Sequence, residues 1–370
     1  MKDTDLLHEI EPDLQLAYED HMESIRDKHN QDNTATKRPF SPVEILAKAT
    51  QTNTDPLIYG PALREDLNNY IAEFETNFGV DVRPVIASSF LVNLLTEDNL
   101  PHYTSRIHSK VIGSEALMLF ANEWTAEEDT HGVIMRDYAL LSGVIGDEDT
   151  SLISNSIYQA GRTSQLRSGT EINPESLQSA FSYLSLQELL TKEAHKTEGW
   201  ILPPNGRKIM NPIAGDEQNH YEFYRRATQA SLNVDPDGTL IALSKVYSNF
   251  SMPGALGIPD FNNHALTIGL SGIFDLETIA KCMRTIAQKL KLDTIKPKTD
   301  AGKSAKERLL NITSSETVIQ KQNIMQKLRS SVEIKPNKNG LIPFILGQTL
   351  DFDYAGSEEY RKPIGLKSII

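Results

Sequence analysis

Apolar residues along the chain recur mostly every three or four positions, the spacing of one face of an α-helix. This spacing is clear in the segments at 84–95, 114–124, 127–143, 175–196, 239–247 and 274–291. Asn173 and Pro174 directly before one of them form a typical helix start, with a capping side chain and a first-turn proline. Because alternating runs rich in β-branched residues are few, the pattern predicts an all-α fold.

The pattern also divides the chain into regions. Residues 1–60 are polar and loosely patterned, and we expect an N-terminal extension that is partly irregular. Residues 61–310 carry the helical bundle, and 311–370 a C-terminal helix and tail. Inside the bundle, the prolines and glycines within 196–212 predict a loop, after which Pro212 begins or kinks a helix.

Composition narrows the functional classes. The 370 residues include 37 Lys and Arg against 50 Asp and Glu, a formal charge of −13, which argues against a general nucleic-acid binder. The single cysteine, Cys282, excludes an internal disulfide and thiolate metal sites. No apolar run approaches the roughly 18 residues of a membrane span, and the acidic N-terminus lacks a secretory signal. We therefore expect a cytoplasmic protein without membrane insertion.

One stretch departs from the acidic background. Between Lys281 and Arg308 there are nine basic residues and three acidic ones. Such a run is either a solvated helix end and loop or a docking surface for an acidic partner.

A doubled motif carries the chemistry. Glu128 and His131 are three residues apart, as are Glu217 and His220, so each pair shares one face of a helix. A further glutamate precedes each motif, Glu97 by 31 positions and Glu188 by 29, a distance that fits an antiparallel pair of helices.

Four helices with this ligand order are typical of carboxylate-bridged di-iron bundles. Glu97 and Glu188 lie in apolar helical segments, where an unpaired carboxylate is costly and calls for a cation. Four carboxylates and two imidazoles suit Fe or Mn. A buried salt-bridge network is the alternative, but no Lys or Arg interleaves these six residues at matching positions. We further expect that Asp216 accepts a hydrogen bond from His131 and Glu127 one from His220.

These residues carry a family resemblance. The blocks "WTAEEDTHG", "DNLPHY", "LQELLT", "AGDEQNH", "DPDGT" and "SMPGALGIPDF" look like those of the acyl-acyl carrier protein (acyl-ACP) desaturases, in particular the bacterial branch. The resemblance implies a ferritin-like helical bundle with additional flanking helices, usually a homodimer. It implies two iron ions held by the six residues above, with Thr191 beside the site where O₂ reacts. It also implies insertion of a cis double bond into an acyl chain on ACP, with electrons from a ferredoxin-type donor.

The chain departs from that family in its N-terminal region. Relatives usually carry a tryptophan there that is linked to electron entry, whereas residues 1–60 contain none. Two alternatives therefore stay open. The altered 196–212 segment motivates a di-iron hydroxylase or N-oxygenase, and the missing tryptophan motivates a non-catalytic metal-binding helical protein. Apolar residues near the ligands that could line an acyl channel, or simply form core, are Leu94, Phe120, Leu184 and Leu189.

Overall fold

The computed structural model describes residues 1–31, 41–78, 81–97, 100, 104, 113–145, 175–250 and 261–331. Within these ranges every regular element is helical, and the expected all-α class is confirmed. The helices are α1 (Asp3–Gln31), α2 (Pro42–Thr50), α3 (Pro56–Phe78), α4 (Arg83–Glu97), α6 (Glu115–Ser142), α8 (Leu177–Ile201), α9 (Pro204–Val234), α10 (Pro236–Ser248), α11 (Phe261–Leu270), α12 (Leu276–Lys289), η2 (Leu292–Thr294), α13 (Asp300–Ile312) and α14 (Ser315–Ser331).

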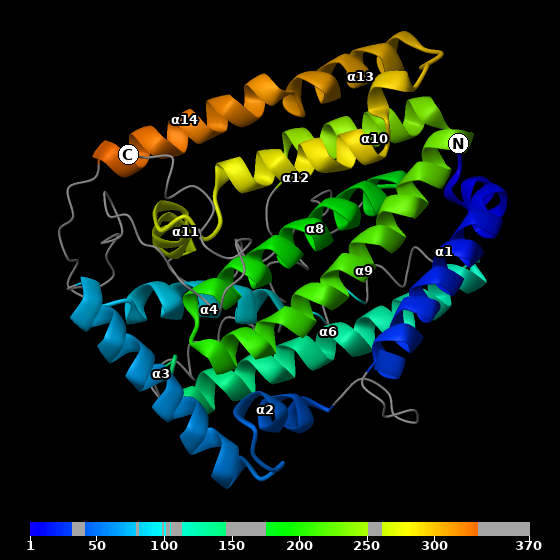
Figure 1. Ribbon diagram of the computed structural model, residues 1–370. Helices are drawn as coiled ribbons and strands as arrows, with labels where there is room; N and C mark the ends of the chain where they lie inside the picture. Colours follow the sequence, from blue (N-terminus) through cyan, green and yellow to red (C-terminus); the bar gives the residue numbers. More distant parts are fainter. Residues whose placement is uncertain are drawn as a thin grey trace.

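Helices α4, α6, α8 and α9 form the centre of the bundle. The long helices α8 and α9 pack along each other, α6 and α4 lie against them, and the remaining helices surround this group (Figure 1). Helix α1 covers α9 and α6, and α3 covers α6 (Figure 1). Helices α10 and α12 pack along α8, α13 packs on the outside of α10, and α14 packs on the outside of α12 (Figure 1). No helix among those described combines the length and hydrophobicity that crossing a bilayer requires.

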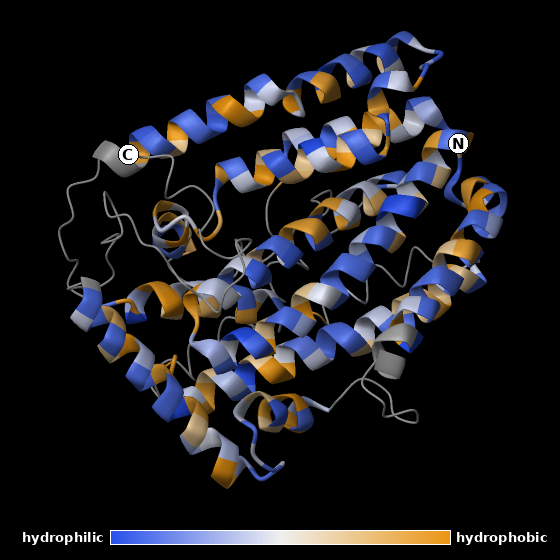
Figure 2. Ribbon diagram, in the orientation of Figure 1, coloured by the Kyte–Doolittle hydropathy of each residue, from blue (hydrophilic) through white to orange (hydrophobic). Residues whose placement is uncertain are grey.

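A polar layer lies between two apolar ones along the central helices. On α6, buried apolar residues at 116–124 belong to one hydrophobic cluster and those at 134–139 to a second. The same change occurs on α9 between 209–213 and 221–232. The buried carboxylates and imidazoles fall between the two clusters, and Figure 2 shows hydrophilic positions along α8 and α9 in the interior of the bundle. The apolar clusters therefore seal the polar layer from both sides.

The expected loop at 196–212 is wrong. Helix α8 continues to Ile201, and α9 begins at Pro204, so Pro212 lies inside α9. Pro204 is the first residue of α9, where the missing N–H costs no hydrogen bond. Ile209, Met210 and Ile213 are buried on one face of this first part of α9. Burial of that apolar face offsets the cost of a proline inside the helix.

The N-terminal region contributes two helices. On α1, Leu6, Ile10 and Leu14 are buried in the same cluster as the first half of α6. Helix α2 begins with a capping box between Ser41 and Glu44 and packs against α6 and α9. The segment 32–40 and the tail 332–370 lie outside the described residues, and the division into three regions stays a prediction.

Candidate metal centre

The six predicted ligands come together in the polar layer. All six side chains are buried, and each of the four central helices contributes one or two of them. They are Glu97 on α4, Glu128 and His131 on α6, Glu188 on α8, and Glu217 and His220 on α9. None of the six residues is more than 7 % exposed. The helical spacing of three residues places the carboxylate and imidazole of each Glu-x-x-His pair on the inward face of its helix.

The six residues form two overlapping groups, each of which could hold a metal ion. One group consists of Glu97, Glu128, His131 and Glu217, and the other of Glu128, Glu188, Glu217 and His220. Within each group the ligand atoms lie within 4.8 Å of one another. Glu128 and Glu217 belong to both groups, whereas each of the other four residues belongs to one. The arrangement is nearly symmetric, with one terminal glutamate and one histidine on each side.

Both histidines direct Nδ1 to the centre and Nε2 away from it. His131 Nδ1 lies 3.3 Å from Glu217 Oε1, while its Nε2 lies 3.4 Å from Asp216 Oδ2. His220 Nδ1 lies 3.0 Å from Glu128 Oε1, and its Nε2 lies 2.8 Å from Glu127 Oε2. Asp216 and Glu127 are thus placed to accept a hydrogen bond from the outer N–H of each ring, which leaves Nδ1 as the free ligand atom.

Several buried polar atoms at the centre face one another at 3.0–3.7 Å but have no hydrogen-bond partner of regular geometry. They are both carboxylate oxygens of Glu188 and of Glu217, Glu128 Oε1, and Nδ1 of His131 and of His220. Polar atoms buried without partners are costly, and carboxylates more so than neutral groups. Oxygen and imidazole nitrogen donors aimed at a common point fit one or two divalent cations, which would satisfy all of them together.

The charges explain how this cluster is tolerated without an ion. Burial, and repulsion by Glu128 and Glu217, hold the pKa of Glu97 well above its ordinary value. Burial and the same two neighbours also raise the pKa of Glu188, against a smaller lowering by His220. Burial alone would raise the pKa of Glu128, but hydrogen bonds to His131 and His220 outweigh it and hold that pKa well below the usual range.

The pKa values of the two histidines are raised, which favours their charged form. Burial lowers the pKa of His131, but its bonds to Asp216, Glu128 and Glu217 outweigh burial and raise it well above normal. The pKa of His220 rises for the same reason, with Glu127 as its strongest partner. These opposite shifts favour an ionised Glu128 beside imidazolium forms of His131 and His220.

Two further residues belong to this site, although the sequence did not single them out. His195 on α8 is fully buried, and its Nε2 lies 3.1 Å from Glu97 Oε1. Glu198, one turn later, is fully buried as well and accepts a hydrogen bond of 2.6 Å from Asn93 Nδ2 on α4. The position of His195 two helical turns after Glu188 was the signal available in the sequence, because residues seven apart share a helix face.

Thr191 and the N-terminal helix complete the surroundings. Thr191, three residues after Glu188, is buried and donates its hydroxyl to the Gln187 carbonyl at 2.8 Å. From α1, the ring of His21 lies 4.9 Å from that of Phe120 and 6.3 Å from that of His220. The extension thus reaches the metal centre.

An apolar cavity of about 470 Å³ lies next to the centre, between α4, α8, α11, α12 and α14. Thr96 and Ala194, the neighbours of Glu97 and His195, form part of its wall. Most of its other lining is apolar, including Val92, Phe261, Ile273, Ile279, Met325 and Leu328. The proposed channel residues Leu94, Phe120 and Leu184 lie in the hydrophobic clusters instead, and Leu189 is also core.

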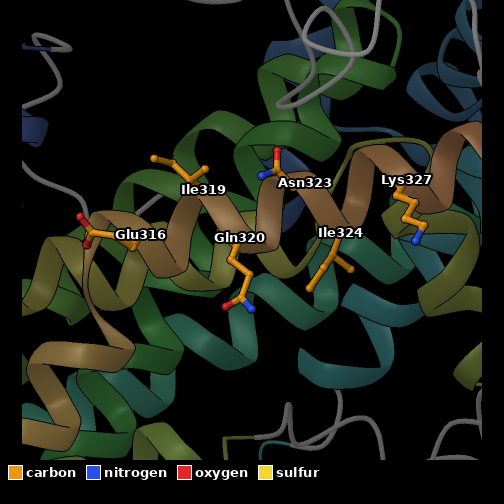
Figure 3. Close-up of a pocket in the computed structure, with 6 residues that line it drawn as sticks. All are labelled: Glu316, Ile319, Gln320, Asn323, Ile324 and Lys327. Carbon is orange, nitrogen blue, oxygen red and sulfur yellow. The ribbon is translucent and has the colours of Figure 1, made fainter.

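A second hollow runs along the outside of α14. It is about 440 Å³ and is lined by Glu316, Ile319, Gln320, Asn323, Ile324 and Lys327, which Figure 3 shows spaced along this one helix. None of the six belongs to the carboxylate–histidine cluster or to the lining of the apolar cavity. The apolar cavity is therefore the better candidate for substrate.

The comparisons with known proteins agree with the geometry. A family model described as fatty acid desaturase matches residues 65–339. Over 267 residues the chain is 27% identical to DesA1 of Mycobacterium tuberculosis, named as an acyl-ACP desaturase, covering 71% of this chain and 73% of that one. It is 26% identical over 270 residues to a seed-specific, chloroplastic stearoyl-ACP 9-desaturase of Brassica napus, covering 68% and 63%.

A solved structure supports the architecture. The X-ray structure of the acyl-ACP desaturase DesA2 from M. tuberculosis superposes with a TM-score of 0.52 at 15% identity, covering 81% of this chain and 98% of that one. At this identity the likeness concerns the fold, and it agrees with a ferritin-like bundle. Most residues of two motif blocks noted in the sequence, at 98–99, 101–103 and 251–260, lie outside the described residues.

Proposed function

Because the chain belongs to the fatty acid desaturase family, we propose that it is an acyl-ACP desaturase, an enzyme that converts a saturated acyl chain on ACP into its cis-unsaturated form. The reaction takes up O₂, two electrons and two protons, and releases two molecules of water. One observation carries this proposal: six buried ligands in two overlapping groups lie beside an apolar cavity.

The metal is iron, with two ions per chain. Glu97 and His131 would hold one ion, Glu188 and His220 the other, and Glu128 and Glu217 would bridge them. Four carboxylates balance the charge of two divalent ions, and the mixed oxygen and nitrogen donors suit iron. Bound iron supplies the activation of O₂ that an unreactive methylene requires.

The protein's own residues position the substrate and keep water out. An alkyl chain offers no polar handle, so shape and apolar contact must hold it, as the lining of the cavity would do. The two hydrophobic clusters exclude solvent from the polar layer. Asp216 and Glu127 would fix the ring orientations of His131 and His220. Thr191 would provide a hydroxyl about one helical turn after Glu188 on α8.

The partners follow from the same activity. ACP carries the substrate, and a ferredoxin-type protein would donate the electrons to a homodimer. Helix α12 begins beside the cavity, where Leu276 and Ile279 line it, and leads into the basic stretch from Lys281 to Arg308. A positively charged surface of this kind would attract an acidic carrier and raise its rate of association.

The test is reconstitution. Purified protein with iron, a reductant, O₂ and stearoyl-ACP should yield a product lighter by two hydrogen atoms. A product heavier by one oxygen would indicate a hydroxylase, although the helical course of 196–212 removes the observation that motivated this alternative. Iron binding without O₂ consumption would indicate a non-catalytic metal protein. Either result would overturn the proposal.

A further inference from the structure

Two polar contacts tie α4 to α8 beside the metal centre. His195 Nε2 on α8 lies 3.1 Å from Glu97 Oε1 on α4. Asn93 Nδ2 on α4 lies 2.6 Å from Glu198 Oε2 on α8. Asn93 and Glu97 are four residues apart, and His195 and Glu198 three, so each pair shares a helix face. The two contacts are therefore neighbours across a single interface.

The same residues form a continuous series inside the protein. His195 Nδ1 lies 4.0 Å from Glu198 Oε2, which is close enough for an electrostatic contact but too long for a hydrogen bond, so the spatial order is Asn93, Glu198, His195 and Glu97. His195 and Glu198 are fully buried. Burial of an imidazole and a carboxyl group is unfavourable, and hydrophobic residues of similar size would serve packing better. Such a pair therefore indicates a role beyond filling the α4–α8 interface.

The role of His195 follows from which helices carry the metal ligands. Helices α6 and α9 each supply two ligands, whereas α4 supplies Glu97 alone. The position of Glu97 relative to the other ligands thus depends on how α4 sits against α8. His195 contacts Glu97 directly and lies 3.8 Å from Glu217 Oε1, so it spans the terminal and the bridging carboxylate of one group. No equivalent contact is needed for Glu188, which belongs to α8 itself.

We propose that His195 is a positioning residue that holds the Glu97 carboxylate toward the ion bound by Glu97 and His131, and that Glu198, held by Asn93, orients the His195 ring. This inference rests on the proposed metal centre and extends it to a second layer of residues. Burial lowers the pKa of His195 to about 4 and raises that of Glu198 to about 8.

The proposal predicts a defect confined to one of the two ions. Replacement of an outer hydrogen-bond partner of a metal ligand typically weakens metal binding about 10- to 100-fold. We expect His195→Phe to weaken the ion at Glu97 and His131 by this factor, and to leave the ion at Glu188 and His220 in place. His195→Gln should restore binding, because the glutamine amide can donate to Glu97 from a similar position. Glu198→Gln, which keeps the contact with Asn93, should have a smaller effect than His195→Phe.

The experiment is an anaerobic titration of the full chain with ⁵⁷Fe(II), followed by Mössbauer spectroscopy, which distinguishes two inequivalent iron sites. Glu193→Gln is the matched control, because Glu193 lies on the same helix but contacts Lys192 at 2.9 Å instead of the centre. Urea unfolding of the metal-free variants shows whether each one folds. If His195→Phe does not fold, the comparison of Glu198→Gln with Glu193→Gln decides, through a change in the spectrum of one site only.

The outcomes separate the inference from the proposed function. Loss of one site in His195→Phe with rescue in His195→Gln supports the inference. The inference is overturned if His195→Phe weakens both iron sites equally, or if both sites are unperturbed in His195→Phe and in Glu198→Gln. Neither result contradicts the proposed metal centre. Failure of the unsubstituted chain to bind iron at all overturns the proposed metal centre and, with it, the positioning role.

Discussion

Loading the metal-free protein with two divalent ions near pH 7 should release about four protons per chain. Metal ligands must be deprotonated, so binding displaces whatever protons they carry. In the metal-free protein, burial and repulsion by neighbouring carboxylates raise the pKa values of Glu97 and Glu188, so we expect both groups to carry protons near pH 7. Hydrogen bonds to carboxylates outweigh burial at His131 and His220 and raise their pKa values, so we expect both rings to be protonated as well.

The net charge of the metal centre leads to the same number of released protons. Without metal, the ionised Glu128 and Glu217, whose pKa values are lowered mainly by the two histidines despite burial, balance two imidazolium groups. With metal, four carboxylates balance two dications and both imidazoles are neutral. Both states have a net charge of zero only if about four protons leave as two ions enter.

The direction in which metal affinity changes with pH follows from this proton release. Since the metal-free state holds more protons, raising the pH must favour the loaded state. Near neutrality, the product of the two dissociation constants should fall by up to about four powers of ten per pH unit. This dependence should flatten at high pH, where the metal-free ligands have lost their protons.

The assay is an anaerobic Fe(II) titration in weakly buffered solution with the pH held constant by added base. The base consumed gives the protons released, and iron analysis gives the ions bound. Glu188→Gln should release about one proton fewer, because it removes one of the four protonated groups. Release of two or fewer protons for two bound ions would contradict this prediction, because it would mean that at least two of the four groups are already deprotonated without metal.

Four other predictions follow from the site and its surroundings. Glu188→Ala and His131→Ala should each lower the iron content; unchanged content in both would remove them from the ligand set. Thr191→Val should leave iron content intact but change the O₂ consumed per product, and an unchanged ratio would show that the hydroxyl is not used. Ala265→Phe, inside the cavity wall, should reduce turnover of long acyl chains more than short ones, whereas an equal reduction would argue against the cavity as the substrate site. Phe120→Ala should lower the free energy of unfolding by about 3–5 kcal/mol in urea titrations, because Phe120 is buried and its ring is stacked on that of Phe223 with a centroid distance of 3.5 Å. A loss under about 1 kcal/mol would contradict this packing.

The doubled motif made the centre predictable. Each Glu-x-x-His pair follows from local helix geometry, so Glu128, His131, Glu217 and His220 could be placed on inward faces without knowledge of the fold. Glu97 and Glu188 required the further step of assuming antiparallel helices, and spacing of about thirty residues supplied it. The placement of Asp216 and Glu127 beside the histidines followed from the equivalence of the two repeats.

The rest depends on contacts between segments distant in the sequence. His195 has no repeat partner, and only the packing of α8 against α4 shows that it reaches Glu97. The segment 196–212 contains three prolines and two glycines, which favour a loop locally, yet burial of Ile209 and Met210 makes it the start of α9. The cavity likewise could not be predicted, because its wall combines residues from five helices.

Anomalous X-ray diffraction at the iron edge, from crystals of iron-loaded protein, tests the central claim most directly. We expect two peaks about 3.5–4 Å apart, both between α4, α6, α8 and α9, with Glu128 and Glu217 contacting both ions. A single peak, or iron bound elsewhere with any of the six side chains turned away, would contradict it.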